Sequence, residues 1–330
     1  MLLVKRQQRI RAFIVVAALI LVGIVLYSGL RYLESTVFYK EQPEPVRQST
    51  RTITRDGVDY YPRQDITTLL FMGIDEYGPA QDSMSYNNPG ESDVVLLVVF
   101  DEAEKDYNIL ALNRDTMVEM PILGLGGKRA GTKVAQLALS HTYGSGLQDS
   151  CENVKETLSM LLGDSFVDYY ISMNMDAIAI LNDAVGGVTV TVEEDFSDVN
   201  SGITKGILTL RGEQALDYVR VRKNLGDQKN ITRMKRQEEY VNGFLTALSG
   251  KSDGNTEFLL SVYEKLAPYL VTDCSFNTFS ALMERYQGFT LGDTMTPEGE
   301  NIIVNGFYEF HLDEAKMDAL ILELFYRPKN

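Results

Sequence analysis

The chain has 330 residues, of which 45% are hydrophobic and nine are proline. It is therefore long enough to bury a large core, and intrinsic disorder is not expected. Its formal net charge of −15 at pH 7 argues against nucleic acid as a partner, because an acidic surface repels a phosphate backbone.

The N-terminal thirty residues predict a membrane anchor. Four basic residues precede an uncharged run over 12–30, and a run of this length spans a bilayer as a helix. Arg31 follows directly, without a small-residue cleavage site, so we expect the span to be retained. Because the basic flank is N-terminal, residues 1–11 are expected in the cytoplasm and 31–330 outside it. The sequence predicts a single-pass membrane protein.

The segment after the anchor is expected to be a stalk. Residues 31–66 contain Pro43, Pro45 and a polar run, which is typical of a spacer between a membrane and a domain. A globular domain is expected over 67–330, because no linker or internal repeat interrupts that range.

Short apolar runs rich in β-forming residues predict strands, and longer stretches between them predict helices. The predicted strands are 67–72, 94–100, 107–112, 169–173 and 188–192. The predicted helices are 150–162, 176–185, 212–219, 232–249, 256–270, 275–287 and 313–325. This alternation indicates the α/β class, as a three-layer α/β sandwich with a central mixed β-sheet flanked by helices.

Charged residues stand at the ends of three predicted strands. Asp75 follows the first strand, Asp93 opens the second, and Arg114 and Asp115 follow the third. If these strands form an antiparallel meander, all four residues lie at one sheet edge. Two carboxylates and an arginine suit a hard cation such as Mg²⁺ together with a substrate phosphate. The aspartates could equally be turn residues, and their spacing alone leaves both interpretations open.

A basic segment stands out in this acidic chain. Residues 211–236 carry eight basic residues against three acidic ones. Arg220 and Arg222 point the same way in extended backbone, and Arg233 and Gln237 share one face of a helix. A solvated charged face would carry interspersed glutamates. Arginine is instead suited to bidentate binding of phosphate, so the segment favours a phosphate site.

The cysteines and histidines carry weaker signals. Cys151 and Cys274 are far apart in sequence, and their spacing leaves open whether they form a disulfide. His141 and His311 have no nucleophile arranged near them in sequence, which is more typical of structural residues than of catalytic bases.

Seven blocks together carry a family resemblance. They are LLFMGID, ESDVVLLVVF, ILALNRDT, TKVAQLALSHTYG, VDYYISMNMDAIAILNDAVGGVTVTV, LRGEQALDYVRVR and GDQKNITRMKRQ. In their order and spacing over residues 67–250 they resemble the LytR-CpsA-Psr family. The resemblance implies an enzyme of the bacterial cell membrane with an extracytoplasmic domain. It would transfer a glycopolymer, such as teichoic acid or capsule, from a polyprenyl pyrophosphate carrier to peptidoglycan through a phosphodiester.

The resemblance also implies roles for individual residues. Asp75 and Asp93 match the family's metal-site aspartates, which would bind Mg²⁺ or Mn²⁺. The residues that match the pyrophosphate-binding set are Arg114, Lys133, Arg220, Arg222, Arg233 and Gln237. Among these, Arg114 would join the two aspartates in catalysis. Asp115 and Asp227 lie in matching blocks and rank second, because either could simply orient a neighbouring arginine.

The chain departs from the family pattern at two positions. The family often places an arginine after the first aspartate and another before the "SD" pair, where this chain has Glu76 or Tyr77 and Glu91. Two positive charges are missing, so either the details of the substrate or the strength of phosphate binding is expected to differ from the family pattern. Apolar segments 175–185 and 238–248 could line a groove for the polyprenyl tail, although their helical spacing is more typical of core packing.

Two alternatives to a transferase remain open from sequence. A hydrolase would cleave the same pyrophosphate with water as acceptor. A noncatalytic, membrane-bound glycan-binding or regulatory module would use the arginines for binding alone. The two aspartates favour a metal, and therefore chemistry, over the second alternative.

Overall fold

The computed structural model describes residues 52–124, 127–163, 167–221, 236, 239–240, 242–244, 246–248, 251, 256–286 and 288–329. The predicted membrane span 12–30 and half of the predicted helix 232–249 lie outside the described residues. Within the described part, no helix has the length and apolar character needed to cross a membrane.

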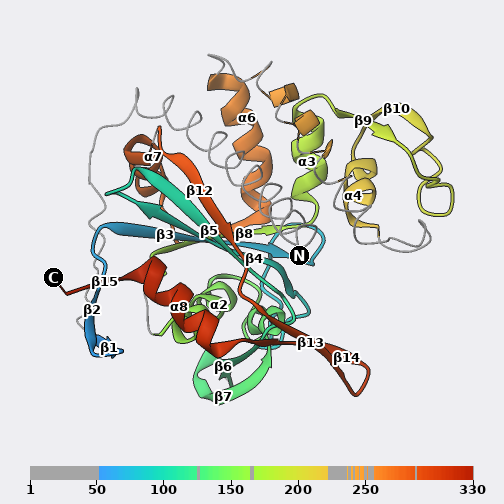
Figure 1. Ribbon diagram of the computed structural model, residues 1–330. Coiled ribbons are helices and arrows are strands. Elements are labelled where there is room, and N and C mark those ends of the chain that lie inside the picture. The colour runs from blue at the N-terminus through green and yellow to red at the C-terminus, as the bar shows by residue number, and fades with distance from the viewer. Residues whose placement is uncertain are drawn as a thin grey trace.

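A six-stranded sheet forms the centre of the molecule (Figure 1). Its strands, in spatial order, are β11 (Leu270–Thr272), β8 (Tyr169–Asn174), β3 (Ile66–Ile74), β4 (Ser92–Asp101), β5 (Asp106–Leu112) and β12 (Thr290–Met295). The pairs β3–β4, β4–β5 and β8–β11 are antiparallel, whereas β3–β8 and β5–β12 are parallel. The central mixed sheet expected from sequence is confirmed.

Helices cover both faces of this sheet. One face packs against α3 (Ala177–Ala184), α4 (Glu213–Arg220), α6 (Thr256–Leu266) and α7 (Phe276–Tyr286). The other packs against the 3₁₀ helix η2 (Leu137–Thr142), α2 (Gln148–Leu161) and α8 (Glu314–Phe325). Leu69 and Phe71 of β3 belong to the first core, and Leu70 and Met72 to the second, because successive strand residues point to opposite faces. Two cores separated by a sheet make three layers.

Smaller sheets surround the centre. Three are hairpins, namely β6 (Met117–Leu123) with β7 (Arg129–Gln136), β9 (Val188–Val192) with β10 (Gly206–Leu210), and β13 (Gly299–Val304) with β14 (Phe307–Leu312). A fourth contains β1 (Ile53–Arg55), β2 (Val58–Pro62) and β15 (Tyr326–Pro328). The short 3₁₀ helix η3 (Ala267–Tyr269) precedes β11.

The N-terminal hairpin differs from the expected stalk. Residues 53–62 form β1 and β2, and β2 pairs with β15 close to the C-terminus. Asp56 and Gly57 both have positive φ, 51° and 78°, which is the geometry that an Asp-Gly hairpin turn requires. The Asp-Gly turn was not recognised from sequence, because the segment around it is polar and was interpreted as a spacer. The folded part of the chain begins before Thr67.

The two cysteines lie in different cores. Cys151 belongs to the core beneath α2, whereas Cys274 belongs to the core on the other face of the sheet. Both are buried free thiols. The structure thereby answers the disulfide question that the sequence left open, because the central sheet separates the two sulfur atoms.

Candidate functional site

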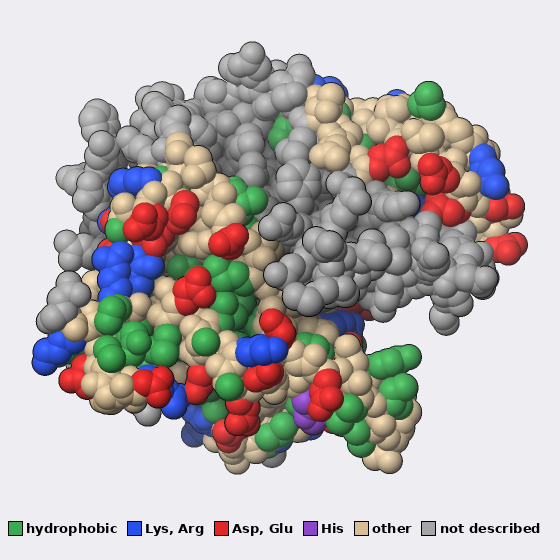
Figure 2. All heavy atoms as spheres, viewed as in Figure 1, with side chains coloured by type: hydrophobic (Ala, Val, Ile, Leu, Met, Phe, Trp, Pro, Cys, Tyr) green, Lys and Arg blue, Asp and Glu red, His purple; other side chains and the backbone are tan. Residues whose placement is uncertain are grey.

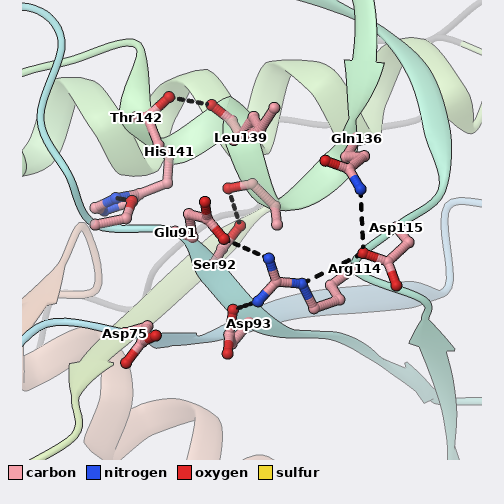
Figure 3. Close-up of polar contacts among 12 residues, drawn as sticks. Asp75, Glu91, Ser92, Asp93, Arg114, Asp115, Gln136, Leu139, His141 and Thr142 are labelled. Carbon is pink, nitrogen blue, oxygen red and sulfur yellow. Dashed lines mark hydrogen bonds and ion pairs between the residues drawn. The ribbon is translucent and has the colours of Figure 1, made fainter. Parts of the chain in front are cut away.

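An antiparallel meander brings three predicted site residues to one edge of the central sheet. The register pairs Ile74 with Ser92 and Val95 with Leu112, so the end of β3, the start of β4 and the end of β5 share that edge. The backbone N–H of Asp75 donates to the carbonyl of Glu91 at 2.9 Å. Figure 3 shows Asp75, Asp93 and Arg114 gathered at this edge.

Arg114 lies among three carboxylates. Its guanidinium forms ion pairs with Glu91 and Asp93, and a longer one with Asp115 at 3.5 Å from Nε (Figure 3). The Arg114 side chain is half-buried, with 28% of its surface exposed. A guanidinium held in one orientation and still open to solvent is suited to bidentate contact with a phosphate.

Arg220 approaches the same edge from helix α4, on the face of the sheet that α3, α6 and α7 also cover. It is the last residue of α4, and its Nη2 donates to Asp75 Oδ1 at 3.0 Å. Its guanidinium also stacks over the Tyr77 ring, 5.3 Å from the centroid, which restricts its orientation. The Arg220 side chain is 43% exposed and that of Asp75 is 34% exposed. An ion pair this open is weak, so either partner is free to bind a ligand.

The remaining predicted residues are placed differently. Lys133 lies on β7 and donates from Nζ to the Tyr143 hydroxyl at 2.9 Å; in the described part of the chain no contact joins it to Arg114. Asp115 accepts a hydrogen bond from Gln136 at 3.3 Å, which fits its predicted role of orienting Arg114. Four predicted residues lie outside the described residues: Arg222, Asp227, Arg233 and Gln237.

The 3₁₀ helix η2 supports the loops that carry the site. The N–H of Ala138 donates to the carbonyl of Arg114 at 2.9 Å, and the Ser92 hydroxyl donates to the carbonyl of Ala138 at 3.3 Å. His141 Nδ1 lies 2.8 Å from the carbonyl of Gly90. A carbonyl only accepts, so Nδ1 carries the hydrogen. Sequence reasoning missed this support, because no pattern marks a short 3₁₀ helix.

His141 is a structural group and not an exposed base. It is 2% exposed, and burial lowers its pKa from 6.5 to about 4 in spite of its bond to Gly90 and the nearby Asp149. Its Nε2 has no hydrogen-bond partner among the described residues. An imidazole with so low a pKa, shielded from solvent, is a poor general base at neutral pH, which agrees with its predicted structural role.

Asn88 and Gly90 complete the support. Asn88 Nδ2 donates to the carbonyls of His141 and Gly144 at 2.8 and 2.9 Å, and its Oδ1 accepts from the N–H of Gly90 at 2.9 Å. A Cβ at Gly90 would stand 2.9 Å from the Glu76 side chain, so a larger residue would displace the loop. The segment that leads into Glu91 is therefore rigidly held.

Acidic side chains outnumber basic ones at the described site. Asp75, Glu76, Glu91, Asp93 and Asp115 face two arginines, Arg114 and Arg220. Burial, together with the charge of Asp75, raises the pKa of Glu76 above its ordinary value of 4.5. This excess of hard oxygen donors and negative charge is suited to a divalent cation.

The helices that could have lined a polyprenyl groove contribute to the core. Ala177, Leu181 and Val185 are buried in the same cluster as Tyr240 and Phe244. For these residues the interpretation as core packing holds.

Comparisons with known proteins agree with the family resemblance. The model of the LytR_cpsA_psr family matches residues 32–325. The chain is 25% identical over 324 residues to the Bacillus subtilis polyisoprenyl-teichoic acid–peptidoglycan teichoic acid transferase TagV, which covers 95% of this chain and 76% of that protein. The crystal structure of B. subtilis TagV matches with a TM-score of 0.54 at 25% identity, over 79% of this chain and 96% of that chain. A structure of TagT bound to LI-WTA matches with a TM-score of 0.52 at 25% identity, over 79% of this chain and 90% of that chain.

Proposed function

Because this chain belongs to the LytR-CpsA-Psr family, we propose that it is a phosphotransferase that moves a glycopolymer from a polyprenyl pyrophosphate carrier to peptidoglycan. The observation that carries the proposal is the convergence of Arg114 and Arg220 on Asp75 and Asp93 at one sheet edge. The name of TagV, a teichoic acid transferase acting on peptidoglycan, supports the same class of reaction.

The proposed step is a displacement at phosphorus. A hydroxyl of the acceptor glycan forms a bond to the glycan-bearing phosphorus and loses its proton. The bond from that phosphorus to the bridging oxygen breaks, and polyprenyl phosphate leaves. A phosphodiester joins the glycopolymer to the acceptor. Phosphoryl transfer depends mainly on positioning and charge stabilisation, which is the chemistry that Arg114 and Arg220 are equipped to supply.

The arginines would bind the charged part of the donor. Arg114 is preoriented by Glu91 and Asp93, and Arg220 by Asp75 and the Tyr77 ring. Donors fixed before the reaction stabilise developing negative charge without reorganising. The predicted contributions of Arg222, Arg233 and Gln237 would add further hydrogen-bond donors to the pyrophosphate.

A divalent cation fits the carboxylates at this edge. Asp75 and Asp93 are the residues that would hold Mg²⁺ or Mn²⁺, and the bound cation would neutralise phosphate charge. Within the described residues there is no group of three or more His, Cys, Asp or Glu side chains arranged to hold a metal by themselves. In the proposed Mg²⁺ site, substrate phosphate and water would supply the remaining oxygens.

The proposed location follows from the N-terminal sequence. The uncharged run 12–30, with its basic flank on the N-terminal side, would anchor the chain with its main domain outside the cytoplasm. The lipid-linked donor and the peptidoglycan acceptor would then share a compartment with the Asp75–Arg114 edge.

A reconstituted reaction tests the proposal. The full chain in proteoliposomes would be incubated with a polyprenyl pyrophosphate-linked glycan and Mg²⁺, with and without peptidoglycan. We expect glycan on the peptidoglycan and release of polyprenyl phosphate that depends on the acceptor. Equal release without peptidoglycan would indicate a hydrolase. Binding without turnover, unchanged in Asp93→Asn, would indicate a noncatalytic module.

A further inference from the structure

The hairpin of β13 and β14 projects from the body of the protein with an apolar tip. Phe307, Ile303 and Tyr308 are 69%, 65% and 62% exposed, and Ile302 and Val304 are also exposed. Figure 1 shows the hairpin extending from the lower right of the molecule, and Figure 2 shows hydrophobic side chains gathered on the same projection. Exposed apolar surface of this kind marks a contact site.

The tip is apolar on both of its faces. Val304 pairs with Phe307 and Ile303 pairs with Tyr308, and successive pairs point to opposite faces of a two-stranded sheet. Asn305 and Gly306 form the turn with φ of 51° and 85°. No residue from Asn301 to Tyr308 is charged, and Glu300 and Glu309 bound this stretch. A flat protein partner would cover only one face, whereas a lipid phase surrounds both.

The chain itself brings a membrane within reach of this tip. The predicted span ends at residue 30, and β1 begins at Ile53, so the segment between them extends at most about 80 Å. Arg55 of β1 forms an ion pair with Asp318 of α8, the helix that directly follows the hairpin. The linker from the anchor therefore enters the fold beside the element that leads out of the hairpin.

We propose that residues 301–308 insert into the interfacial region of the membrane leaflet on the same side as the domain. Glu309 is three residue steps along the strand from Gly306 of the turn, which corresponds to about 10 Å. This matches the depth to which interfacial segments enter a bilayer. Glu300 and Glu309 then remain in water, and the aromatic rings of Phe307 and Tyr308 lie at the boundary between headgroups and acyl chains, where interfacial segments bury their apolar side chains.

Such insertion would orient the sheet edge that carries Arg114. The hairpin is joined to that edge by two hydrogen bonds, because the N–H of Phe310 donates to the carbonyl of Asp115 at 2.8 Å and Gln136 Nε2 donates to the carbonyl of Tyr308 at 2.7 Å. A hairpin fixed in the interface therefore holds the Asp115 loop at a constant height above the lipid. The proposed insertion depends on the predicted membrane anchor and not on the proposed transfer reaction.

The absence of tryptophan from the chain allows a direct test. Phe307→Trp places a single reporter at the tip, and Ile207→Trp places one on β10, where Ile207 is 82% exposed. The full chain would be reconstituted in phosphatidylcholine–phosphatidylglycerol vesicles, with or without phosphatidylcholine brominated on its acyl chains. We expect quenching by brominated lipid and protection from iodide for Phe307→Trp, and the reverse for Ile207→Trp.

A second substitution separates insertion from a change of fold. Adding Ile303→Asp to Phe307→Trp is expected to abolish lipid quenching while the circular dichroism spectrum stays unchanged. Emission at short wavelength without lipid quenching would mean that a second copy, or another segment of this chain, covers the tip. That result would overturn the proposal. So would a chain that fails to float with the vesicles, or iodide quenching of Phe307→Trp as strong as that of Ile207→Trp.

Discussion

Arg220 Nη2 donates to Asp75 Oδ1 at 3.0 Å, joining the end of helix α4 to the residue that follows the first strand of the meander. Both side chains are more than one third exposed. Their mutual attraction is therefore screened by water and contributes little to stability. The contact does place an arginine and a carboxylate side by side. A bound phosphate could replace Asp75 as the partner of Arg220, and a bound cation could replace Arg220 as the partner of Asp75.

Arg220→Ala is expected to lower kcat/KM for polymer transfer while leaving the fold intact. Loss of one charge-assisted bond to phosphate costs about 1.5–3 kcal/mol, which corresponds to a factor of roughly ten to a few hundred in rate. The same loss is predicted for Arg222→Ala and Arg233→Ala. Initial rates with a polyprenyl pyrophosphate-linked donor, together with thermal unfolding, measure the two effects separately.

Arg211→Ala is the matched control, because Arg211 is an exposed arginine that precedes helix α4. Its removal should change stability by less than about 0.5 kcal/mol and leave activity unaltered. If Arg220→Ala transfers polymer as fast as Arg211→Ala, or is inactive only because it unfolds, Arg220 is not a phosphate ligand.

Removal of divalent cations is expected to abolish transfer, and Asp75→Asn and Asp93→Asn should each raise the Mg²⁺ concentration for half-maximal rate by at least about tenfold. Each substitution replaces a charged oxygen donor with a neutral amide. The measurement pairs a Mg²⁺ titration of activity with Mn²⁺ binding by electron paramagnetic resonance. Asp198→Asn, an exposed carboxylate between β9 and β10, is the control. Unchanged Mn²⁺ binding in both site variants would place the cation elsewhere.

Glu91→Gln is expected to strengthen donor binding. Glu91 stands where the related pattern carries an arginine, and its carboxylate pairs with Arg114, so it opposes the binding of an anion. For a partly exposed pair, removing this charge should lower KM by roughly two- to fivefold. Glu104→Gln, in the turn at the opposite sheet edge, controls for overall charge. A higher KM in Glu91→Gln alone would show instead that Glu91 is needed to hold Arg114 in place.

The central sheet could be predicted because its strands are continuous apolar runs. The runs at 67–72, 94–100 and 107–112 correspond to β3, β4 and β5, and short connections make an antiparallel meander the simplest topology. That topology alone placed Asp75, Asp93 and Arg114 at one edge. The positions of charged residues relative to strand ends thus carried most of the information about the site.

The support for the site could not be predicted in this way. His141 contacts Gly90, and Gln136 contacts both Asp115 and Tyr308, through hydrogen bonds between segments distant in sequence. Single polar residues leave no periodic pattern. The apolar tip of the β13–β14 hairpin was missed for another reason, because helical and strand periods cannot be distinguished in so short a run.

Both cysteines are expected to be unreactive in the folded protein. Burial raises the pKa of the Cys151 thiol and of the Cys274 thiol to about 12, so almost no thiolate forms at neutral pH. A chromogenic disulfide reagent should detect no thiol in the native chain and both thiols after denaturation without reductant. Detection of none after denaturation would mean that the two are bonded.

The stability of the protein is expected to depend on pH through His141. Its folded pKa of about 4 lies below the ordinary value of 6.5, so on acidification the unfolded chain binds a proton that the folded chain does not. Stability therefore falls as the pH drops from about 6.5 towards about 4. This one residue should lower the free energy of unfolding by about 2 kcal/mol between about pH 7.5 and about pH 5.

His141→Asn isolates this contribution, because the asparagine amide can replace the Nδ1 hydrogen bond to Gly90 and does not titrate. Urea unfolding at both pH values should show a smaller loss of stability on acidification in His141→Asn than in the parent chain. His141→Gln extends its amide towards the Nε2 position and leaves the Gly90 carbonyl without its donor. It should reduce transfer more than His141→Asn does. An identical pH dependence in all three proteins would mean that His141 binds its proton at the same pH in the folded chain as in the unfolded chain.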